Sequence, residues 1–228
     1  MSRTKRLHEG APTDGPRKAD YYATPAWATR ALLSRWWPTD GARSVGHGPL
    51  QVYDPGAGDG AILREVHAYN VMDRQQRPDV SLALLRGMDV RQAAVDECRG
   101  QGFAVDLGDF LTDSAPLPPG VEIICNPPYG GRDNLAQRFV ARALQVQQPG
   151  GWVWMLLRLM WINDGQSTHK RVTWLRETVG MPRVLALPRR PSFTGKGNDA
   201  TTYAWFGWRA GERLTVGTFA ILAEGREE

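Results

Sequence analysis

Cysteine is scarce in this chain of 228 residues, which contains only Cys98 and Cys125. Neither a paired C-x-x-C spacing nor a histidine cluster accompanies them, so we expect no disulfide framework and no metal site. Long apolar segments are missing too, because the longest run, 152–162, is shorter than a bilayer span and contains Arg158. The first residues are basic but lack the apolar core of a secretory signal. These absences favour a soluble protein of a reducing cytoplasm, without a membrane partner.

The composition is that of a folded globular protein. Glycine and proline, at 25 and 16 residues, stay below the level that indicates disorder, and the hydrophobic content of 42% can supply one core. Residues 1–18 differ, because they combine glycine, proline and charge without periodicity. We therefore predict a flexible basic arm over 1–18 and a single domain over 19–228.

Charge is distributed unevenly, although the formal net charge is only +4. Residues 54–113 hold eleven acidic residues against six arginines, whereas 158–196 hold eight basic residues against two acidic ones. Such a run is often only a solvated face. A polyanionic partner is the alternative, and it gains weight where other features agree.

Strand and helix patterns alternate through the first two thirds of the chain. The strand segments are apolar rather than alternating, which indicates a parallel sheet covered by helices on both faces. We expect strands within 50–58, 82–90, 103–110, 121–128 and 152–159, and helices within 25–37, 61–72, 91–102 and 134–147. The segments 183–188 and 201–208 are joined without a helix, so they predict a closing antiparallel pair.

Acidic residues follow three of these strands. Asp54 opens the turn DPGAGDG, whose glycines include Gly56 and Gly58 on either side of Ala57. A turn of this kind lets a ligand approach the backbone, although it also occurs without any ligand. Asp89 can accept both hydroxyls of a ribose, with Val90 packed on a purine. Asp109 can accept from an adenine amino group, with Phe110 over the ring.

The ligand expected at these acids is a cationic nucleoside. Three carboxylates would repel a pyrophosphate, and the turn lacks the lysine of a P-loop. In an open parallel sheet, ligands lie at the carboxyl ends of the strands, where all three acids fall. S-adenosylmethionine carries an ammonium and a sulfonium, so we predict it as the cofactor.

Five segments occur in a set order: YYATP at 21–25, DPGAGDG at 54–60, NPPY at 126–129, RPSFTGKG at 190–197 and YAWFGW at 203–208. This order resembles the amino-methylating DNA methyltransferases, especially small phage and prophage adenine-N6 enzymes of restriction-modification type. NPPY after a strand is the specific part. The resemblance implies an α/β, Rossmann-like class I methyltransferase fold with a seven-stranded, mostly parallel sheet. It also implies that Tyr22, Thr24 and Pro25 flank the methionine end of the cofactor.

The NPPY motif explains how a weak nucleophile can react. An amino group on an aromatic ring delocalises its lone pair, so the enzyme must draw that pair out of conjugation. The Asn126 side-chain oxygen and the Pro127 carbonyl can each accept one N–H, and Pro127 and Pro128 stiffen the loop. Tyr129 can stack on a flipped base, which is worth about 1–3 kcal/mol. We expect in-line methyl transfer without a metal or a covalent intermediate.

The late RPSFTGKG segment predicts the other wall of the base site. Phe193 can close on the target base, while Arg189, Arg190 and Lys196 can hold phosphates. Core packing of Phe193 and plain surface charge for the basic residues are the alternatives. Because no separate target-recognition domain is expected, specificity is assigned to loops at 163–180 and 189–200.

Three other functions remain open from the sequence. A protein glutamine methyltransferase also uses NPPY, against a planar amide nitrogen, but it needs neither the basic stretch nor the RPSFTGKG segment. An RNA adenine methyltransferase would use the same residues as the DNA enzyme. A nucleic-acid-binding module with a vestigial cofactor site is the third, and the intact NPPY and three acids count against it.

Overall fold

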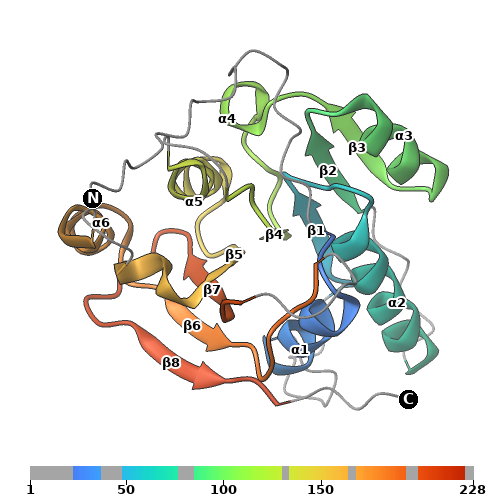
Figure 1. Ribbon diagram of the computed structural model, residues 1–228. Coiled ribbons are helices and arrows are strands. Elements are labelled where there is room, and N and C mark those ends of the chain that lie inside the picture. Colours follow the sequence, from blue (N-terminus) through green and yellow to red (C-terminus); the bar gives the residue numbers. More distant parts are fainter. Residues whose placement is uncertain are drawn as a thin grey trace, which may run out of the picture.

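The computed structural model describes residues 23–36, 48–76, 85–129, 134–163, 168–193 and 200–223. Within these residues one mixed sheet has eight strands, in the order β3-β2-β1-β4-β5-β7-β6-β8 (Figure 1). The strands are β1 (Gln51–Asp54), β2 (Arg86–Asp89), β3 (Ala104–Leu107), β4 (Val121–Cys125), β5 (Trp152–Arg158), β6 (Arg183–Ala186), β7 (Tyr203–Arg209) and β8 (Thr218–Ile221). The predicted α/β fold with a mostly parallel sheet is confirmed.

Helices cover both faces of the sheet. In Figure 1, α1, α2 and α3 lie on one side of the strands, and α4, α5 and α6 lie on the other. Their bounds are α1 (Ala26–Trp36), α2 (Ala61–Gln76), α3 (Gln92–Gly100), α4 (Phe110–Asp113), α5 (Leu135–Val146) and α6 (Thr168–Trp174). The four long helical segments expected from the sequence are thus present.

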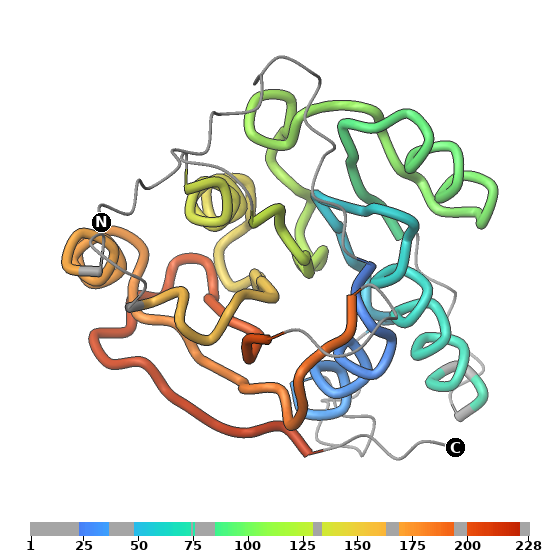
Figure 2. The backbone as a smooth tube through the Cα atoms, viewed as in Figure 1, coloured from blue at the N-terminus to red at the C-terminus, as the bar shows by residue number. Residues whose placement is uncertain are grey.

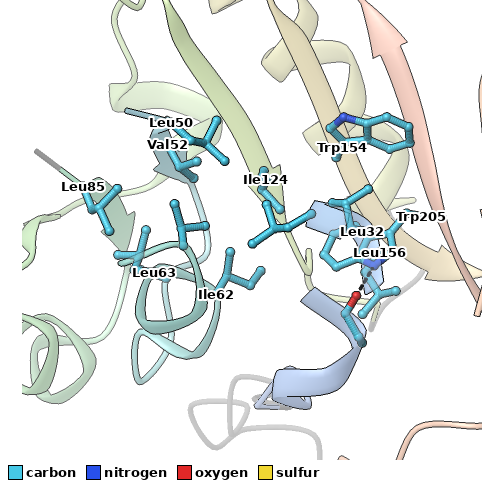
Figure 3. Packing of buried hydrophobic residues seen from close by; sticks show 14 of the residues in the cluster. Leu32, Leu50, Val52, Ile62, Leu63, Leu85, Ile124, Trp154, Leu156 and Trp205 are labelled. Carbon is cyan, nitrogen blue, oxygen red and sulfur yellow. Dashed lines mark hydrogen bonds between the residues drawn. The ribbon is translucent and has the colours of Figure 1, made fainter. Parts of the chain in front are cut away.

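Alternating side chains of the central strands enter two separate cores. Ile124 of β4 and Leu156 of β5 pack toward α1 and α2, where Leu32 and Leu63 are fully buried (Figure 3). The neighbouring β4 and β5 residues point to the opposite face and pack against α5. The central strands are therefore buried on both sides, which explains their nearly continuous apolar sequence.

The first core also fixes α1 to the far half of the sheet. The indole Nε1 of Trp205, in β7, donates to the Ala28 carbonyl of α1 at 2.9 Å, the bond that Figure 3 draws as a dashed line. Next to it, Gly207 leaves room for Trp154, because a Cβ on Gly207 would lie 2.3 Å from that ring. The start of α1 is thereby held beside the sheet.

The C-terminal strands run as expected, with one addition. β7 pairs antiparallel with both β5 and β6, which confirms the antiparallel closing pair. β8 then pairs parallel with β6 and forms the sheet edge, so an eighth strand is added to the seven predicted. Three of its four residues are exposed, which explains why no strand pattern marked it.

Residues 163–180 were expected to form a loop, and that expectation is wrong. The stretch contains α6 and a π-helical turn, Leu175–Val179. Arg171 and Leu175, one helical turn apart, are both buried.

The strand order has a topological switch point between β1 and β4. The chain runs from β1 outward to β2 and β3, and then returns to the other side of β1 as β4. Ligands of open parallel sheets bind at the carboxyl ends of the strands where the order reverses in this way. Asp54 ends β1 and Asn126 follows β4, so both lie at this point.

Candidate active site

The Gly-rich turn after β1 is held by hydrogen bonds to Asp54, at the end of β1, and to Met88 of β2. The Gly56 amide donates to Asp54 Oδ1 at 3.1 Å, and the Ala57 amide donates to the Met88 carbonyl at 3.1 Å. Gly58 and Gly60 have φ of 57° and 81°, which favour glycine. The turn therefore adopts a conformation that few other sequences allow.

Asp54 is a buried carboxylate with only 1% of its surface exposed. Burial raises its pKa to about 7, against the hydrogen bonds from the Gly56 amide and the Cys125 thiol, while Asp89 and Asp59 add repulsion. Burial also raises the pKa of the Cys125 thiol, which keeps that group protonated as a donor. A bound cation would favour the ionised form of Asp54.

Asp89, at the end of β2, accepts four hydrogen bonds. Its Oδ2 accepts from the Gly58 amide at 3.0 Å and its Oδ1 from the Arg91 amide at 2.9 Å. The Arg91 guanidinium binds both oxygens, through Nε at 3.0 Å and Nη2 at 3.1 Å. The acid predicted to hold a ribose thus already ties the Gly-rich turn to the start of α3.

An apolar rim lies next to Asp89. Val90 is 60% exposed, and its packing on a purine stays a prediction. Leu107, which pairs with Asp89 across β2 and β3, is also exposed, at 52%. The sequence reasoning missed Leu107, although its place at the end of the third strand was available as a signal.

Asp109 and Phe110 differ in how well they fit their predicted roles. Asp109 is exposed and caps α4, with Oδ1 accepting from the Leu111 amide at 2.9 Å. The Phe110 ring is only 1% exposed and packs against Tyr53 and Phe139, with centroids 6.2 and 5.3 Å away. Phe110 therefore packs in the core beside the strand ends, and its contact with a ligand ring stays a prediction.

The NPPY motif lies directly beside the Gly-rich turn. A Cβ built on Gly56 would lie 3.4 Å from Cys125 Sγ and 3.8 Å from the Asn126 carbonyl oxygen. Pro127 is buried, and the Asn126, Pro128 and Tyr129 residues are half-buried. The structure therefore brings the predicted donor site and the predicted reacting site together.

Tyr129 is anchored through its hydroxyl. The oxygen lies 2.5 Å from the Leu156 carbonyl oxygen of β5, and the hydroxyl also contacts Asn126 Oδ1. The recorded pairs of β4 with β5 end at Cys125 and Met155, and the two prolines that follow have no N–H to continue them. The Tyr129 hydroxyl therefore donates to the Leu156 carbonyl, to which the prolines of the motif cannot donate from their backbone.

Three aromatic rings form a row next to the motif. Tyr129 meets Tyr203 edge to face at 5.7 Å between centroids, and Tyr203 meets Phe193 in the same way at 5.0 Å. The Arg158 guanidinium lies over Tyr129, 6.0 Å from its centroid. Phe193 therefore lies near the motif as expected, whereas Tyr203 and Arg158 were not assigned to the site from the sequence.

The segment after β6 returns to the start of α1. Figure 2 shows this orange segment beside the blue start of α1, and the Arg189 guanidinium lies 4.8 Å from the Trp27 ring centroid. Arg190 is exposed, whereas Thr24 is buried and Pro25 half-buried. Tyr22 and Lys196 lie outside the described residues. Arg189, a predicted phosphate-binding residue, thus contacts α1 two residues after Pro25 of the predicted methionine-end segment.

Two properties of the described residues concern membranes and metals. None of their helices has the length and apolar character needed to cross a bilayer. They also contain no group of three or more His, Cys, Asp or Glu side chains that could hold a metal ion.

Comparisons with known proteins find similarity in structure only. No protein-family model and no curated protein sequence matches the chain. Among solved structures, a Listeria monocytogenes protein described as a class I S-adenosylmethionine-dependent methyltransferase superposes with a TM-score of 0.63 at 13% identity, over 91% of this chain and 68% of that one. The chain has the class I methyltransferase fold.

Two further neighbours belong to restriction-modification systems. The type I methyltransferase subunit from Streptococcus thermophilus has a TM-score of 0.62 at 13% identity, over 88% of this chain and 47% of that one. The M protein of the type I restriction enzyme EcoKI has a TM-score of 0.57 at 18% identity, over 82% and 43%. The chain thus spans less than half the length of these subunits.

Proposed function

We propose that the chain is an S-adenosylmethionine-dependent methyltransferase that modifies the N6 amino group of adenine in DNA. The observation that carries this proposal is the placement of Asp54 and Asp89 beside Asn126, at the carboxyl ends of β1, β2 and β4. Cofactor acids and amide acceptor then share the point where the strand order reverses.

The donor site fits a positively charged nucleoside. Asp54 is buried beside two other carboxylates, so an ammonium or sulfonium there relieves repulsion as well as forming its own contacts. Asp89, whose carboxylate the Arg91 guanidinium binds, is the acid proposed to hold the ribose, and Val90 and Leu107 offer apolar surface to the purine. S-adenosylmethionine supplies the methyl group on its sulfonium. The Gly-rich turn lets that group come close to the backbone.

The acceptor site fits a planar amino group. Asn126 Oδ1 and the Pro127 carbonyl would accept its two N–H bonds, which turns the nitrogen lone pair toward the methyl group. Bound S-adenosylmethionine would supply a methyl group: an N–CH₃ bond would form as the S–CH₃ bond breaks, and the nitrogen would then lose one proton to water. Most of the rate acceleration would come from holding the amino nitrogen and the methyl group close together and in line.

DNA is the preferred substrate for two reasons. Tyr129 and Phe193 are half-buried aromatic residues near the motif, with the buried Tyr203 ring between them. Arg158, Arg189 and Arg190 belong to the basic stretch 158–196. Two structural neighbours are methyltransferase subunits of DNA restriction-modification systems. RNA adenine and a protein glutamine amide remain the competing substrates.

A competition assay tests the assignment. The chain is incubated with methyl-labelled S-adenosylmethionine and equal amounts of plasmid DNA, RNA and a release-factor-like protein. Label in DNA supports the proposal, and label confined to RNA or protein replaces it with the corresponding alternative. The Asn126→Ala variant should still bind cofactor but lose transfer, since it removes the side-chain amide whose oxygen is the proposed acceptor.

A further inference from the structure

The carboxylate of Asp89 has no acceptor position left for a ribose. A carboxylate offers about four lone-pair positions, and four donors already face this one. Two of the donors are the backbone amides of Gly58 and Arg91. The other two, Nε and Nη2, belong to the Arg91 guanidinium.

Of the four donors to Asp89, only those of the Arg91 guanidinium can move away without a change in the backbone. The two amides belong to the Gly-rich turn and to the first position before α3, where Arg91 has extended φ and ψ of −104° and 119°. The Arg91 side chain is 32% exposed, whereas that of Asp89 is 7% exposed. Rotation of the Arg91 side chain toward water would therefore open two adjacent acceptor positions on a nearly buried carboxylate.

We propose that Arg91 is a competitor at the cofactor site: its Nε and Nη2 occupy the positions of two ribose hydroxyls and must leave when the cofactor binds. A ribose diol presents two O–H donors on neighbouring carbons, which match the paired donors of the guanidinium fork. The inference rests on the proposed function, because that function places the ribose at Asp89.

The contact between Arg91 and Asp89 also stabilises the buried carboxylate. A nearly buried carboxylate without a charged partner is costly, and Arg91 supplies that partner at 3.0 Å. The same contact must be broken for ribose binding, so it lowers affinity for the cofactor. Arg91 thus sets the cofactor affinity without contributing to the reaction itself.

Calorimetry with three ligands tests this role. S-adenosylmethionine, adenosine and adenine are titrated into wild type and Arg91→Ala. We expect Arg91→Ala to bind the two ribose-containing ligands about 2- to 5-fold more tightly, as for loss of a partly exposed ion pair worth up to about 1 kcal/mol. Adenine lacks the diol, so its affinity should be the same in both proteins.

Arg183→Ala is the matched control. Arg183 also makes a two-pronged ion pair, with Glu212 at 3.1 and 3.2 Å, and its side chain is 28% exposed. It lies on β6, far from β2 in the strand order. Its loss should leave all three affinities unchanged, which separates competition at Asp89 from a general effect of removing an arginine.

Each outcome decides the inference. Weaker or unchanged S-adenosylmethionine binding by Arg91→Ala overturns it, as does an equal gain for adenine. If neither protein binds any ribose-containing ligand, the ribose site at Asp89 is wrong and the inference falls with it. If the affinities shift as expected but no substrate is methylated, the competitor role stands and the proposed function fails.

Discussion

Glu122 offers a test of the fold that does not depend on any ligand. It lies on β4 with 8% of its surface exposed, and its Oε2 accepts a hydrogen bond from the Trp152 amide. Burial raises its pKa to about 7, more than the Trp152 hydrogen bond and the Arg209 charge lower it. Between about pH 4.5 and pH 7, Glu122 is therefore protonated in the folded protein but ionised in the unfolded chain, where its pKa is near 4.5.

The sign and size of the effect follow from this difference. Because the folded pKa is raised, the stability linked to Glu122 is fully present below about pH 4.5 and is lost as pH rises through about 7. The full shift corresponds to about 3 kcal/mol as an upper value. Glu122→Gln stays neutral and keeps an acceptor for the Trp152 amide. It should match wild type near pH 4 and exceed it by up to about 3 kcal/mol at pH 8.

Urea unfolding of both proteins from pH 4 to pH 8 measures this difference directly. Asp54 contributes a pH dependence of the same sign to both proteins, so only their difference reports Glu122. Glu212→Gln is the control with opposite sign, because hydrogen bonding from Arg183 lowers the Glu212 pKa. A wild-type-to-Glu122→Gln difference that is constant with pH, or that favours wild type at pH 8, would refute the reasoning.

Three other perturbations test the site. Burial raises the pKa of Asp54 to about 7, so cofactor affinity of wild type should rise about fivefold to tenfold from pH 6 to pH 7.5 as Asp54 ionises. Calorimetry should show proton release on cofactor binding, and a fall in affinity over this range would contradict the role of Asp54. Tyr129→Phe should lower kcat about tenfold with little change in KM for DNA, because it loses the hydroxyl contacts to Leu156 and Asn126 but keeps the ring. Tyr129→Ala should also raise KM, and full activity of Tyr129→Phe would rule out a positioning role for the hydroxyl. Gly87→Ala places a Cβ 2.6 Å from the Asp54 carbonyl and should cost about 1–3 kcal/mol in thermal unfolding, whereas Gly100→Ala, with open space around it, should not; equal stability of the two variants would contradict the packing described.

Strong, buried elements were predictable from the sequence. The strands that became β1 to β7 are marked by apolar segments, and the long helices by turns and glycines at their ends. Most of these elements are buried on a defined side, whereas β3 buries only Val105. The segment of α6 was missed because short helices have too few residues to show a clear period. β8 was missed because an exposed edge strand leaves little pattern in its sequence.

The site was predictable in its position but not in its contacts. Asp54, Asp89 and Asn126 meet because strand ends share one edge of the sheet, which the order of elements implies. Phe110 could not be placed, since an aromatic residue after a strand can face either core or ligand, and here α4 turns it inward. The pairing of Arg91 with Asp89 depends on the backbone between them, which no residue pattern specifies.

Nucleoside mass spectrometry of methylation-free plasmid DNA, exposed to the chain and S-adenosylmethionine, tests the central claim most directly. The account predicts N6-methyldeoxyadenosine with wild type and none with Asn126→Ala at equal cofactor binding. Unmodified adenine with wild type, or equal methylation by both proteins, would contradict it.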